Sequence, residues 1–570
     1  MPFSTARSVF LTITIAGVGV QAQAQGAQAG LPPVPQVEGV PTAAQQAAAK
    51  IDPERIRASV KYLADDKLEG RGPGTEGDRL AAKYLADQLA SYGVTPAGDN
   101  GSWYQKVPLY SVQTVPDKTS FQLVPKEGEP LTLKYGADFV TNNQTGAAVA
   151  DIDAPIVFVG YGIRAPEYDW DDYKGVDVRG KVVLVIVNEP PSQDEGFFKG
   201  KALTYYGRWT YKYEEAVRQG AIGALIIHRE DLASYPWQVV RSSWSGEKSY
   251  LVGDPNAKLK AAAWLQHDIA EKIASPAGND LDDVIDKAGK RNVSRETTWR
   301  LKAHIVSEKR SFDSENVVGM VAGKGAGPEE SVLYTAHFDH LGMDKKLPGD
   351  KIYNGAADNA TGCGILLELA RAFENAAKAG TPPPHRVYFA AVTAEEQGLL
   401  GSEYLGMHPP VPQKDLTLDL NYDMLLPVGV PTSTDVLGAE RTTFYPTVES
   451  AAKDFDLTIQ TDQFPAAGHY YRSDHFSLAR YGIPAFSIGQ GTLFAGHDAS
   501  WGVEQMKQYT AERYHQPSDE YKPEMDFRGD ARMAQFGFDL GWLASEAKSE
   551  QGWQAGDEFD APRKKSMPAQ

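Results

Sequence analysis

The second half of the chain alternates short apolar runs with longer amphipathic segments. Residues 331–340, 386–396, 416–424 and 483–489 are apolar runs of strand length, and residues 363–377 have apolar positions at helical spacing. Strands that alternate with helices predict an α/β fold with a doubly wound, mostly parallel sheet. Ligands bind such sheets beyond the carboxyl ends of the strands. The first two runs end in polar residues, and Asp423 lies at the end of the third, so we expect functional side chains there.

The first half of the chain has a different pattern. Residues 56–71 and 79–93 have the period of amphipathic helices, and a turn-rich loop joins them. Residues 105–150 alternate apolar and polar positions, which predicts β-structure. Short β-rich runs follow, at 155–163 and 181–190, bounded by Gly, Asp and Pro. Because these runs interrupt the pattern that leads to the second half, they indicate an inserted domain.

These patterns set the expected domain boundaries. The inserted, β-rich domain spans residues 153–290 and divides the α/β domain into residues 51–152 and 291–548. Residues 25–50 are rich in Ala, Gln, Pro and Gly, which predicts a flexible linker. Residues 549–570 are a polar tail that we expect to be frayed.

The first 24 residues have the features of a secretory signal. Arg7 gives a positive start, residues 8–20 form a short apolar run, and small residues lead to a cleavage site after Ala24 or Ala29. The run is too short for a comfortable membrane span, so an uncleaved anchor is the weaker alternative. The prediction is a periplasmic or secreted protein with no membrane attachment after cleavage.

Composition and net charge limit the partners and the metal sites that we expect for this chain. The chain has 570 residues, which predicts two or three domains, and a formal net charge of −18, which makes nucleic acid and anionic membranes poor partners. Most of that charge is explained by solubility alone. Cys363 is the single cysteine, so the chain can form neither an internal disulfide nor a cysteine-rich zinc module. Cys363 lies at an apolar helix start and is expected to be packed. Any metal must be held by histidine and carboxylate.

Candidate ligands of that kind follow the predicted strands. His337 ends the first run, and Asp339 is spaced to hold its other ring nitrogen, which would fix the tautomer. His340 is a rival ligand that fits this spacing less well. Asp358 lies in a loop of small residues before an apolar helix. Taken alone, Asp358 is better explained as a helix cap or turn residue. As a metal ligand, its two oxygens would bridge two cations.

The adjacent pair Glu395 and Glu396 is the strongest signal. It follows a wholly apolar strand, so both carboxylates reach one cleft. One is suited to bind metal, while the other is free to take a proton from an activated water and deliver it to a leaving amine. The alternative is a solvated acidic helix start. Further along the chain, other residues complete the candidate set: the carboxylate Asp423, the imidazole His515, the possible oxyanion donor Tyr514, and Asp519, which would orient His515 or cap the next segment.

These motifs resemble those of metallopeptidase family 28, which includes dizinc aminopeptidases, glutamate carboxypeptidases, a receptor ectodomain and glutaminyl cyclases. The resemblance covers roughly residues 52–150 and 300–548, and the insert resembles a protease-associated (PA) domain. It implies a zinc exopeptidase fold with two Zn²⁺ ions. The motifs are AHFDHLG, NGAADNATG, TAEEQGLLGS, NYDM, YRSDHFSLARYGIPAF and YHQPSDE.

The resemblance also implies roles for the residues. One zinc would be held by His337, Asp423 and one oxygen of Asp358, and the other by Glu396, His515 and the second oxygen of Asp358. Glu395 would be the general base and then the general acid. Asp339 would support His337, and Tyr514 would stabilise the tetrahedral intermediate.

The implied function is an exported zinc aminopeptidase acting on peptides. Three alternatives stay open from the sequence: a carboxypeptidase of the same mechanism, a glutaminyl cyclase-like acyl transferase, and a receptor or binding module. Carboxylate recognition by arginine would mark a carboxypeptidase, and Arg472 is the one arginine that stands near a motif in this respect. Asp474 and His475 are candidates for supporting or substrate-facing roles, and His497 is expected to be structural.

Overall fold

The computed structural model describes residues 30–274, 280–325, 327, 330–462, 465–546 and 551–567. The predicted signal at residues 1–24 lies outside them. Part of the expected linker is packed: helix α1, Thr42–Ala48, buries Ala44 and Ala48 fully and contacts helix α9, Thr361–Lys378. No helix within the described part of the chain has the length and apolar character that a membrane crossing requires.

The main sheet has the predicted parallel core. Its strands run in the order β21, β18, β14, β17 and then β13, and the first four are parallel to one another. β13 is antiparallel to β17, and it continues the sheet by antiparallel pairing with β1 and β2. The bounds are β14 Ser331–His337, β17 Val387–Val392, β18 Leu416–Asn421, β21 Ala485–Ser487, β13 Arg295–Val321, β1 Thr95–Pro96, β2 Tyr104–Thr114 and β11 Lys248–Leu251, which pairs with β2.

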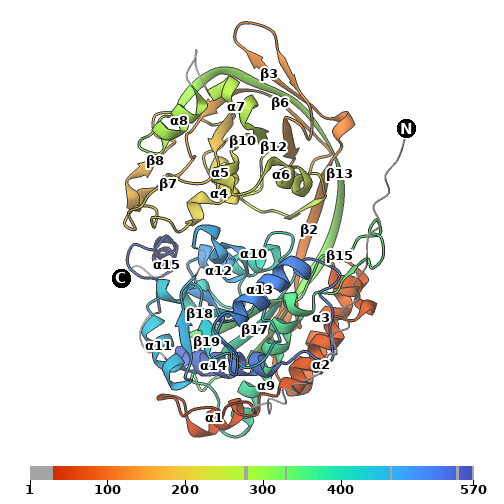
Figure 1. Ribbon diagram of the computed structural model, residues 1–570, viewed down its shortest axis with the longest axis vertical. Helices are drawn as coiled ribbons and strands as arrows, with labels where there is room; N and C mark the ends of the chain where they lie inside the picture. Colours follow the sequence, from red (N-terminus) through yellow and green to blue (C-terminus); the bar gives the residue numbers. More distant parts are fainter. Residues whose placement is uncertain are drawn as a thin grey trace, which may run out of the picture. The chain divides into compact units, whose positions relative to one another are not determined.

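Helices cover both faces of this sheet, as a doubly wound fold requires (Figure 1). On β14, Tyr334 points to one face, where its hydroxyl donates to the carbonyl of Gly537 on α14, 2.6 Å away. The next residue back, Leu333, packs on the other face with Leu405 of α10 and Leu478 of α12. The α/β prediction is therefore confirmed.

The helices of the main domain, in addition to α1 and α9, are α2 Pro53–Leu63, α3 Glu76–Tyr92, α10 Leu400–Met407, α11 Tyr445–Asp454, α12 His475–Arg480, α13 Trp501–Glu512, α14 Arg528–Glu546 and α15 Asp560–Ser566.

A second sheet carries the predicted insert, and it extends beyond 153–290. It includes the first part of β13, which pairs with β3 and β6, while the later part of β13 belongs to the main sheet. One 27-residue strand thus serves both sheets, so the insert's sheet begins at residue 120 and ends near 306. Its other strands are β3 Ser120–Pro125, β4 Leu131–Leu133, β5 Phe139–Asn142, β6 Val149–Phe158, β9 Val182–Ile186, β10 Gly223–His228 and β12 Ala261–Gln266.

Short elements complete the two parts. The insert has helices α4 Trp209–Arg218, α5 Glu230–Ala233, α6 Trp237–Trp244, α7 His267–Ala274 and α8 Leu281–Ala288, with the hairpin β7 Arg164–Ala165 and β8 Trp170–Asp171. The main domain adds β15 Gly342–Met343, β16 Ile352–Tyr353, β19 Ser433–Asp435, β20 Thr458–Gln460 and β22 Gly489–Gln490.

The C-terminal segment is not frayed over its described residues. Trp553 and Phe559 are buried in the core beside α12. Arg441 binds the carboxylates of Asp557 and Glu558, at 2.9 and 2.7 Å, which attaches the segment to the main domain. The expectation of an unpacked polar tail is wrong for these residues, because the polar composition includes four anchoring residues: the apolar Trp553 and Phe559 and the ion-paired Asp557 and Glu558.

Candidate metal centre

The predicted ligands lie at one edge of the main sheet. His337 is the last residue of β14, Asp423 lies two residues after β18, and Glu395 and Glu396 follow β17. Because these strands are parallel, their carboxyl ends meet at the same edge. Asp358 reaches this edge from the turn before α9.

Asp358 lies between two histidines. Its Oδ1 is 3.4 Å from His337 Nε2, and its Oδ2 is 3.3 Å from His515 Nε2. On one side, Asp423 Oδ1 is 3.1 Å from His337 Nε2. On the other, Glu396 Oε2 is 3.2 Å from His515 Nε2. The two oxygens of one carboxylate therefore face two separate histidine–carboxylate groups, which is the arrangement that a bridging ligand needs.

His340 also belongs to the cluster, on the Glu396 side. Its Nδ1 is 2.6 Å from Glu396 Oε1, but the two groups form no hydrogen bond. Candidate ligand atoms of His340, Asp358 and Glu396 all lie within 4.8 Å of one another, as do those of His337, Asp358 and Asp423. The structure thus offers two imidazoles, His340 and His515, for one group, where the sequence favoured only His515.

Asp339 has a role that the sequence did not indicate. Its carboxylate accepts the backbone N–H of Glu395 at 3.0 Å and that of Glu396 at 3.4 Å. The nearest carboxylate oxygen is 3.7 Å from His337 Nδ1, which lies 3.3 Å from the Asp339 backbone oxygen instead. Asp339 therefore fixes the backbone of the glutamate pair first, and supports His337 at longer range.

Glu395 is buried beside the cluster without joining either group. Its Oε2 is 4.0 Å from His337 Nε2, and no described residue donates a hydrogen bond to its carboxylate. Burial raises the pKa of Glu395 well above its usual range, and the charges of Glu396 and Asp423 raise it further. A carboxylate with a raised pKa and no fixed partner is suited to accept and release a proton.

Tyr514 stands next to His515, as its predicted role requires. The two rings stack with centroids 3.9 Å apart, and the Tyr514 side chain remains 39% exposed. Burial of its hydroxyl raises the pKa of Tyr514 above its usual value, with further contributions from Asp358 and Glu396. The raised pKa keeps the Tyr514 hydroxyl neutral, so it can donate a hydrogen bond.

Asp519 holds the loop of Asp358 rather than His515. Its Oδ2 accepts the backbone N–H groups of Ala357 and Asp358, each at 3.1 Å. The Tyr509 hydroxyl donates to the same oxygen at 3.2 Å, and Arg513 donates to Oδ1 at 3.1 Å. Asp519 is fully buried. It therefore sets the position from which Asp358 reaches both histidines.

Arg71 is a supporting residue that sequence reasoning missed. It lies in the turn-rich loop between α2 and α3, and its guanidinium is fully buried. Gly355, with φ of +58°, allows the close approach, since a Cβ there would lie 2.8 Å from Arg71 Nη2. The glycine-rich loop was the available signal. Arg71 donates to the carbonyls of Leu63, Phe338, Asn354 and Gly355, at 2.5, 2.6, 2.5 and 3.0 Å.

Asp474 and His475 are buried behind the cluster. Burial raises the pKa of Asp474 to about 7 and lowers that of His475 to about 3, so His475 is neutral. His475 Nδ1 lies 3.3 Å from Asn421 Nδ2. His497 lies away from them and stacks on Trp501 at 3.7 Å, as a structural histidine would.

The donor set fits divalent cations. The cluster combines buried carboxylates with imidazole nitrogens, and such charges are not stable together in a low-dielectric site without compensation. The unpartnered nitrogens of His340 and Oε1 of Glu396 are directed at the same space. Mixed imidazole and carboxylate ligands are those that zinc accepts. Among the carboxyl groups of the cluster, Asp339, Asp358 and Asp474 are buried, while Glu395, Glu396 and Asp423 are partly buried.

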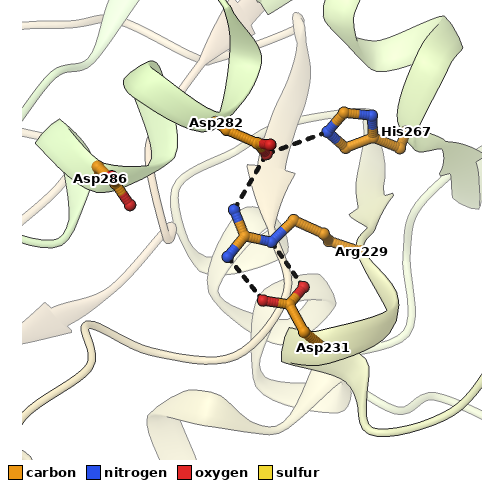
Figure 2. A pocket seen from close by; sticks show the side chains of 5 residues that line it. All are labelled: Arg229, Asp231, His267, Asp282 and Asp286. Atoms are coloured by element: carbon orange, nitrogen blue, oxygen red, sulfur yellow. Dashed lines mark hydrogen bonds and ion pairs between the residues drawn. The ribbon is translucent and has the colours of Figure 1, made fainter.

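A separate pocket of about 530 Å³ lies in the insert and is unrelated to this centre. Figure 2 shows that its arginine is already paired: Arg229 binds Asp231 through two nitrogens and Asp282 through a third. His267 lies 3.4 Å from Asp282. We assign no chemistry to this pocket.

Comparison with known proteins agrees with the location of the cluster. The model of peptidase family M28 matches residues 316–536. Aminopeptidase YwaD of Bacillus subtilis (strain 168) is 30% identical over 134 residues, which is 23% of this chain and 25% of that protein. Leupeptin-inactivating enzyme 1 of Streptomyces exfoliatus is 28% identical over 201 residues, or 34% and 40% of the two chains. The matched region thus spans less than half of either relative.

Two solved structures resemble this chain at low identity. An aminopeptidase from Aneurinibacillus sp. strain AM-1 is 18% identical with a TM-score of 0.44, covering 88% of this chain and 96% of that one. The zinc aminopeptidase BSAP from Bacillus subtilis is 16% identical with a TM-score of 0.40, covering 88% and 98%. These scores are too low to support an inference. The match to the model of peptidase family M28 contains every histidine and carboxylate of the cluster, so residues 316–536 of this chain resemble that family.

Proposed function

We propose that this protein is a zinc-dependent exopeptidase, and specifically an aminopeptidase that uses two zinc ions. The observation that carries the proposal is Asp358, whose two oxygens face His337 on one side and His515 on the other. A structural or single-metal site does not need a carboxylate in that position. The names of similar proteins, among them aminopeptidase YwaD, support the choice of reaction.

Each side chain then has a defined task. His337, Asp423 and Asp358 would hold one ion, while Glu396, Asp358 and an imidazole from His515 or His340 would hold the other. Two bound zinc ions would supply Lewis acidity, lowering the pKa of a water to about 7 and polarising the peptide carbonyl.

Proton transfer belongs to Glu395. Its carboxylate, raised in pKa and free of fixed hydrogen bonds, accepts the proton of the attacking water and then delivers it to the leaving amine. Asp339 holds the Glu395 backbone so that the carboxylate keeps its position. The Tyr514 hydroxyl donates to the oxyanion that develops on the substrate carbonyl.

The substrate we propose is a peptide with a free N-terminal amine, and the location is periplasmic or secreted, based on residues 1–24. The insert's resemblance to a PA domain is part of the same proposal. Export is tested by cell fractionation with N-terminal sequencing, in which a cytoplasmic, uncleaved chain would refute it.

The decisive variant for the reaction is Glu395→Gln. We expect peptide cleavage to fall at least about 10²-fold, the lower range for loss of a general acid–base, while elemental analysis finds two zinc ions per chain as in the wild type. Glu374→Gln on α9 is the matched control and should retain activity. Full activity in Glu395→Gln would refute the assigned role. Cleavage of N-blocked but not C-amidated peptides would replace aminopeptidase by carboxypeptidase.

A further inference from the structure

The turn after β17 carries the glutamate pair and has strained backbone angles. Ala394, directly before Glu395, has φ of +54°, and Leu399 has φ of +63°. Residues other than glycine adopt this left-handed region at a cost, and they persist there when the surrounding structure holds them in place. The position of Glu395 therefore depends on the contacts that fix the two ends of the turn, Thr393 and Gly401.

Asn316 of β13 binds both ends of this turn. Its Oδ1 accepts the Thr393 N–H at 3.0 Å, and its Nδ2 donates to the Gly401 carbonyl at 2.9 Å. The two ends also bind each other, because the Gly401 N–H donates to the Thr393 carbonyl at 2.9 Å. Asn316 and Thr393 are fully buried, so no water is at hand to replace these hydrogen bonds. The Asn316 amide therefore closes the turn at its base.

The orientation of the Asn316 amide is fixed as well. Its Nδ2 also donates to Gln105 Oε1 at 2.9 Å, on the residue opposite it in β2. Gln105 itself donates to the His408 carbonyl at 2.6 Å, directly after α10. Exchanging the oxygen and nitrogen of Asn316 would set donor against donor at Thr393 and acceptor against acceptor at Gly401. Gly401 permits the close approach, since a Cβ there would lie 2.6 Å from Asn316 Oδ1.

Ser314 binds the side chain of the same threonine. It lies two residues before Asn316, on the same face of β13. The hydroxyl oxygens of Ser314 and Thr393 are 2.6 Å apart, and the Ser314 hydroxyl donates to Asp78 Oδ2 at 2.7 Å. Because a hydroxyl has one hydrogen, Thr393 is the donor to Ser314. Thr393, two residues before Glu395, is thus fixed by β13 through both its backbone and its side chain.

The proposed reaction requires an accurate position for Glu395. A general base has to come within hydrogen-bond reach, about 2.6–3.2 Å, of the group whose proton it takes. A displacement of about 1 Å can cost roughly 10²-fold in rate. Asp339 accepts the Glu395 N–H at 3.0 Å and so holds the residue itself. The contacts from β13 hold the ends of the turn on which that residue stands.

We propose that Asn316 and Ser314 are positioning residues for Glu395, and that they act through Thr393 and Gly401. The inference rests on the proposed peptidase function and extends it, because it assigns part of the catalytic machinery to β13. The same strand also belongs to the sheet of the insert. Both side chains act on the geometry of proton transfer, and the reacting atoms are touched by Glu395.

The first test is peptide hydrolysis by Asn316→Leu, which keeps the approximate size of the side chain and removes its hydrogen bonds. We expect kcat to fall about 10- to 100-fold with KM nearly unchanged, because the base is displaced while the groups that bind substrate stay in place. Thr393→Val removes one neutral hydrogen bond and should lower kcat about 2- to 10-fold. Thr393→Ser keeps the hydroxyl and should restore kcat.

Asn143 offers a matched control in another part of the chain. It is also fully buried, and its side chain accepts the Thr145 N–H at 3.0 Å and donates to the Ala147 carbonyl at 2.8 Å. Asn143→Leu thus removes the same kind of amide from a different turn. It should lower the urea midpoint as Asn316→Leu does, while kcat and KM keep their wild-type values.

A double variant distinguishes positioning from loss of folded protein. In Glu395→Gln the base is already absent, so the further change Asn316→Leu should leave the residual rate unchanged. A fall by the same factor in both backgrounds, or a wild-type kcat in Asn316→Leu, would overturn the inference. If Asn316→Leu does not fold, Thr393→Val is combined with Glu395→Gln, and the same two outcomes decide.

Hydrogen exchange separates this inference from the peptidase proposal. We expect Asn316→Leu to speed amide exchange at residues 393–401, and Asn143→Leu to speed it at Thr145 instead. If the wild type cleaves no peptide but these local changes are found, the peptidase proposal fails and Asn316 still holds the turn. If peptides are cleaved and Asn316→Leu keeps the wild-type kcat, the positioning role alone fails.

Discussion

The most direct test of how the metal centre is built is removal of Asp519. Its carboxylate is the shared acceptor for the N–H groups of Ala357 and Asp358, at 3.1 Å each, and it is fully buried. In Asp519→Ala both N–H groups are left buried without a partner, each at a cost of about 1–3 kcal/mol. We therefore expect the free energy of unfolding to fall by roughly 3–6 kcal/mol, once the lost Arg513 ion pair is included.

The loss of position should also reach the metal. Because Asp358 is the ligand between both groups, we expect zinc affinity in Asp519→Ala to fall about 10- to 100-fold, the range seen when residues supporting a metal ligand are removed. Asp519→Asn keeps one oxygen that can accept the Asp358 N–H, so its zinc affinity should lie between that of the wild type and that of Asp519→Ala. Chelator competition measures the affinity, and urea denaturation measures the unfolding energy.

The control is Asp280→Ala in the insert. Asp280 also accepts a backbone N–H, that of Asp282 at 3.0 Å, but it caps an exposed helix end. The Asp280→Ala substitution should lower the free energy of unfolding by about 1 kcal/mol and leave zinc binding unchanged. Wild-type zinc affinity in Asp519→Ala would refute the reasoning, since Asp358 would then hold its position without these hydrogen bonds.

Two further predictions concern His340 and Asp78. His340→Ala should reduce the zinc content from two towards one ion per chain after dialysis, because His340 Nδ1 lies 2.6 Å from Glu396 Oε1. Two zinc ions per chain with full activity in this variant would show that His515 is the only imidazole that this group needs. Burial raises the pKa of Asp78 to about 7 in the folded protein, against about 3.9 when unfolded. Ionising it therefore destabilises the wild type as pH rises from about 4 to about 7, by up to roughly 4 kcal/mol relative to Asp78→Asn. Urea denaturation at pH 4, 5.5 and 7.5 measures this, and a pH-independent difference would show that the hydrogen bonds from Gly74 and Ser314 keep Asp78 ionised.

The sequence was sufficient to predict the strands that carry the metal centre. Apolar runs of strand length identified β14, β17 and β18, because buried parallel strands are apolar on both faces. Their parallel order then brought His337, Glu395 and Asp423 to one edge.

The roles of His340, Asp339 and Arg71 could not be predicted from the local sequence pattern. His340 lies in an irregular turn three residues after the end of β14. The direction of its side chain depends on the backbone angles of this turn, which hydrophobic periodicity does not predict. Asp339 was assigned to His337 by spacing, yet its strongest bonds go to Glu395 and Glu396. Arg71 binds carbonyls more than 260 residues away in the chain, at Phe338 and Asn354.

The domain boundaries show the same limit. Residues 291–548 were expected to belong to the α/β domain, but β13, Arg295–Val321, pairs with β6 of the insert at one end and with β17 of the main sheet at the other. Strand propensity cannot report which partner a strand has, since pairing is decided by the rest of the sheet.

The sequence by itself determined the fold class, the order of the metal-binding residues and the class of chemistry, because these depend on periodicity and on residue type at strand ends. The tertiary structure alone decided which histidines share a carboxylate and which buried groups hold Asp358. The physical reason is that these contacts join segments far apart in the chain. Their geometry is set by the packing of both sheets and not by any local pattern.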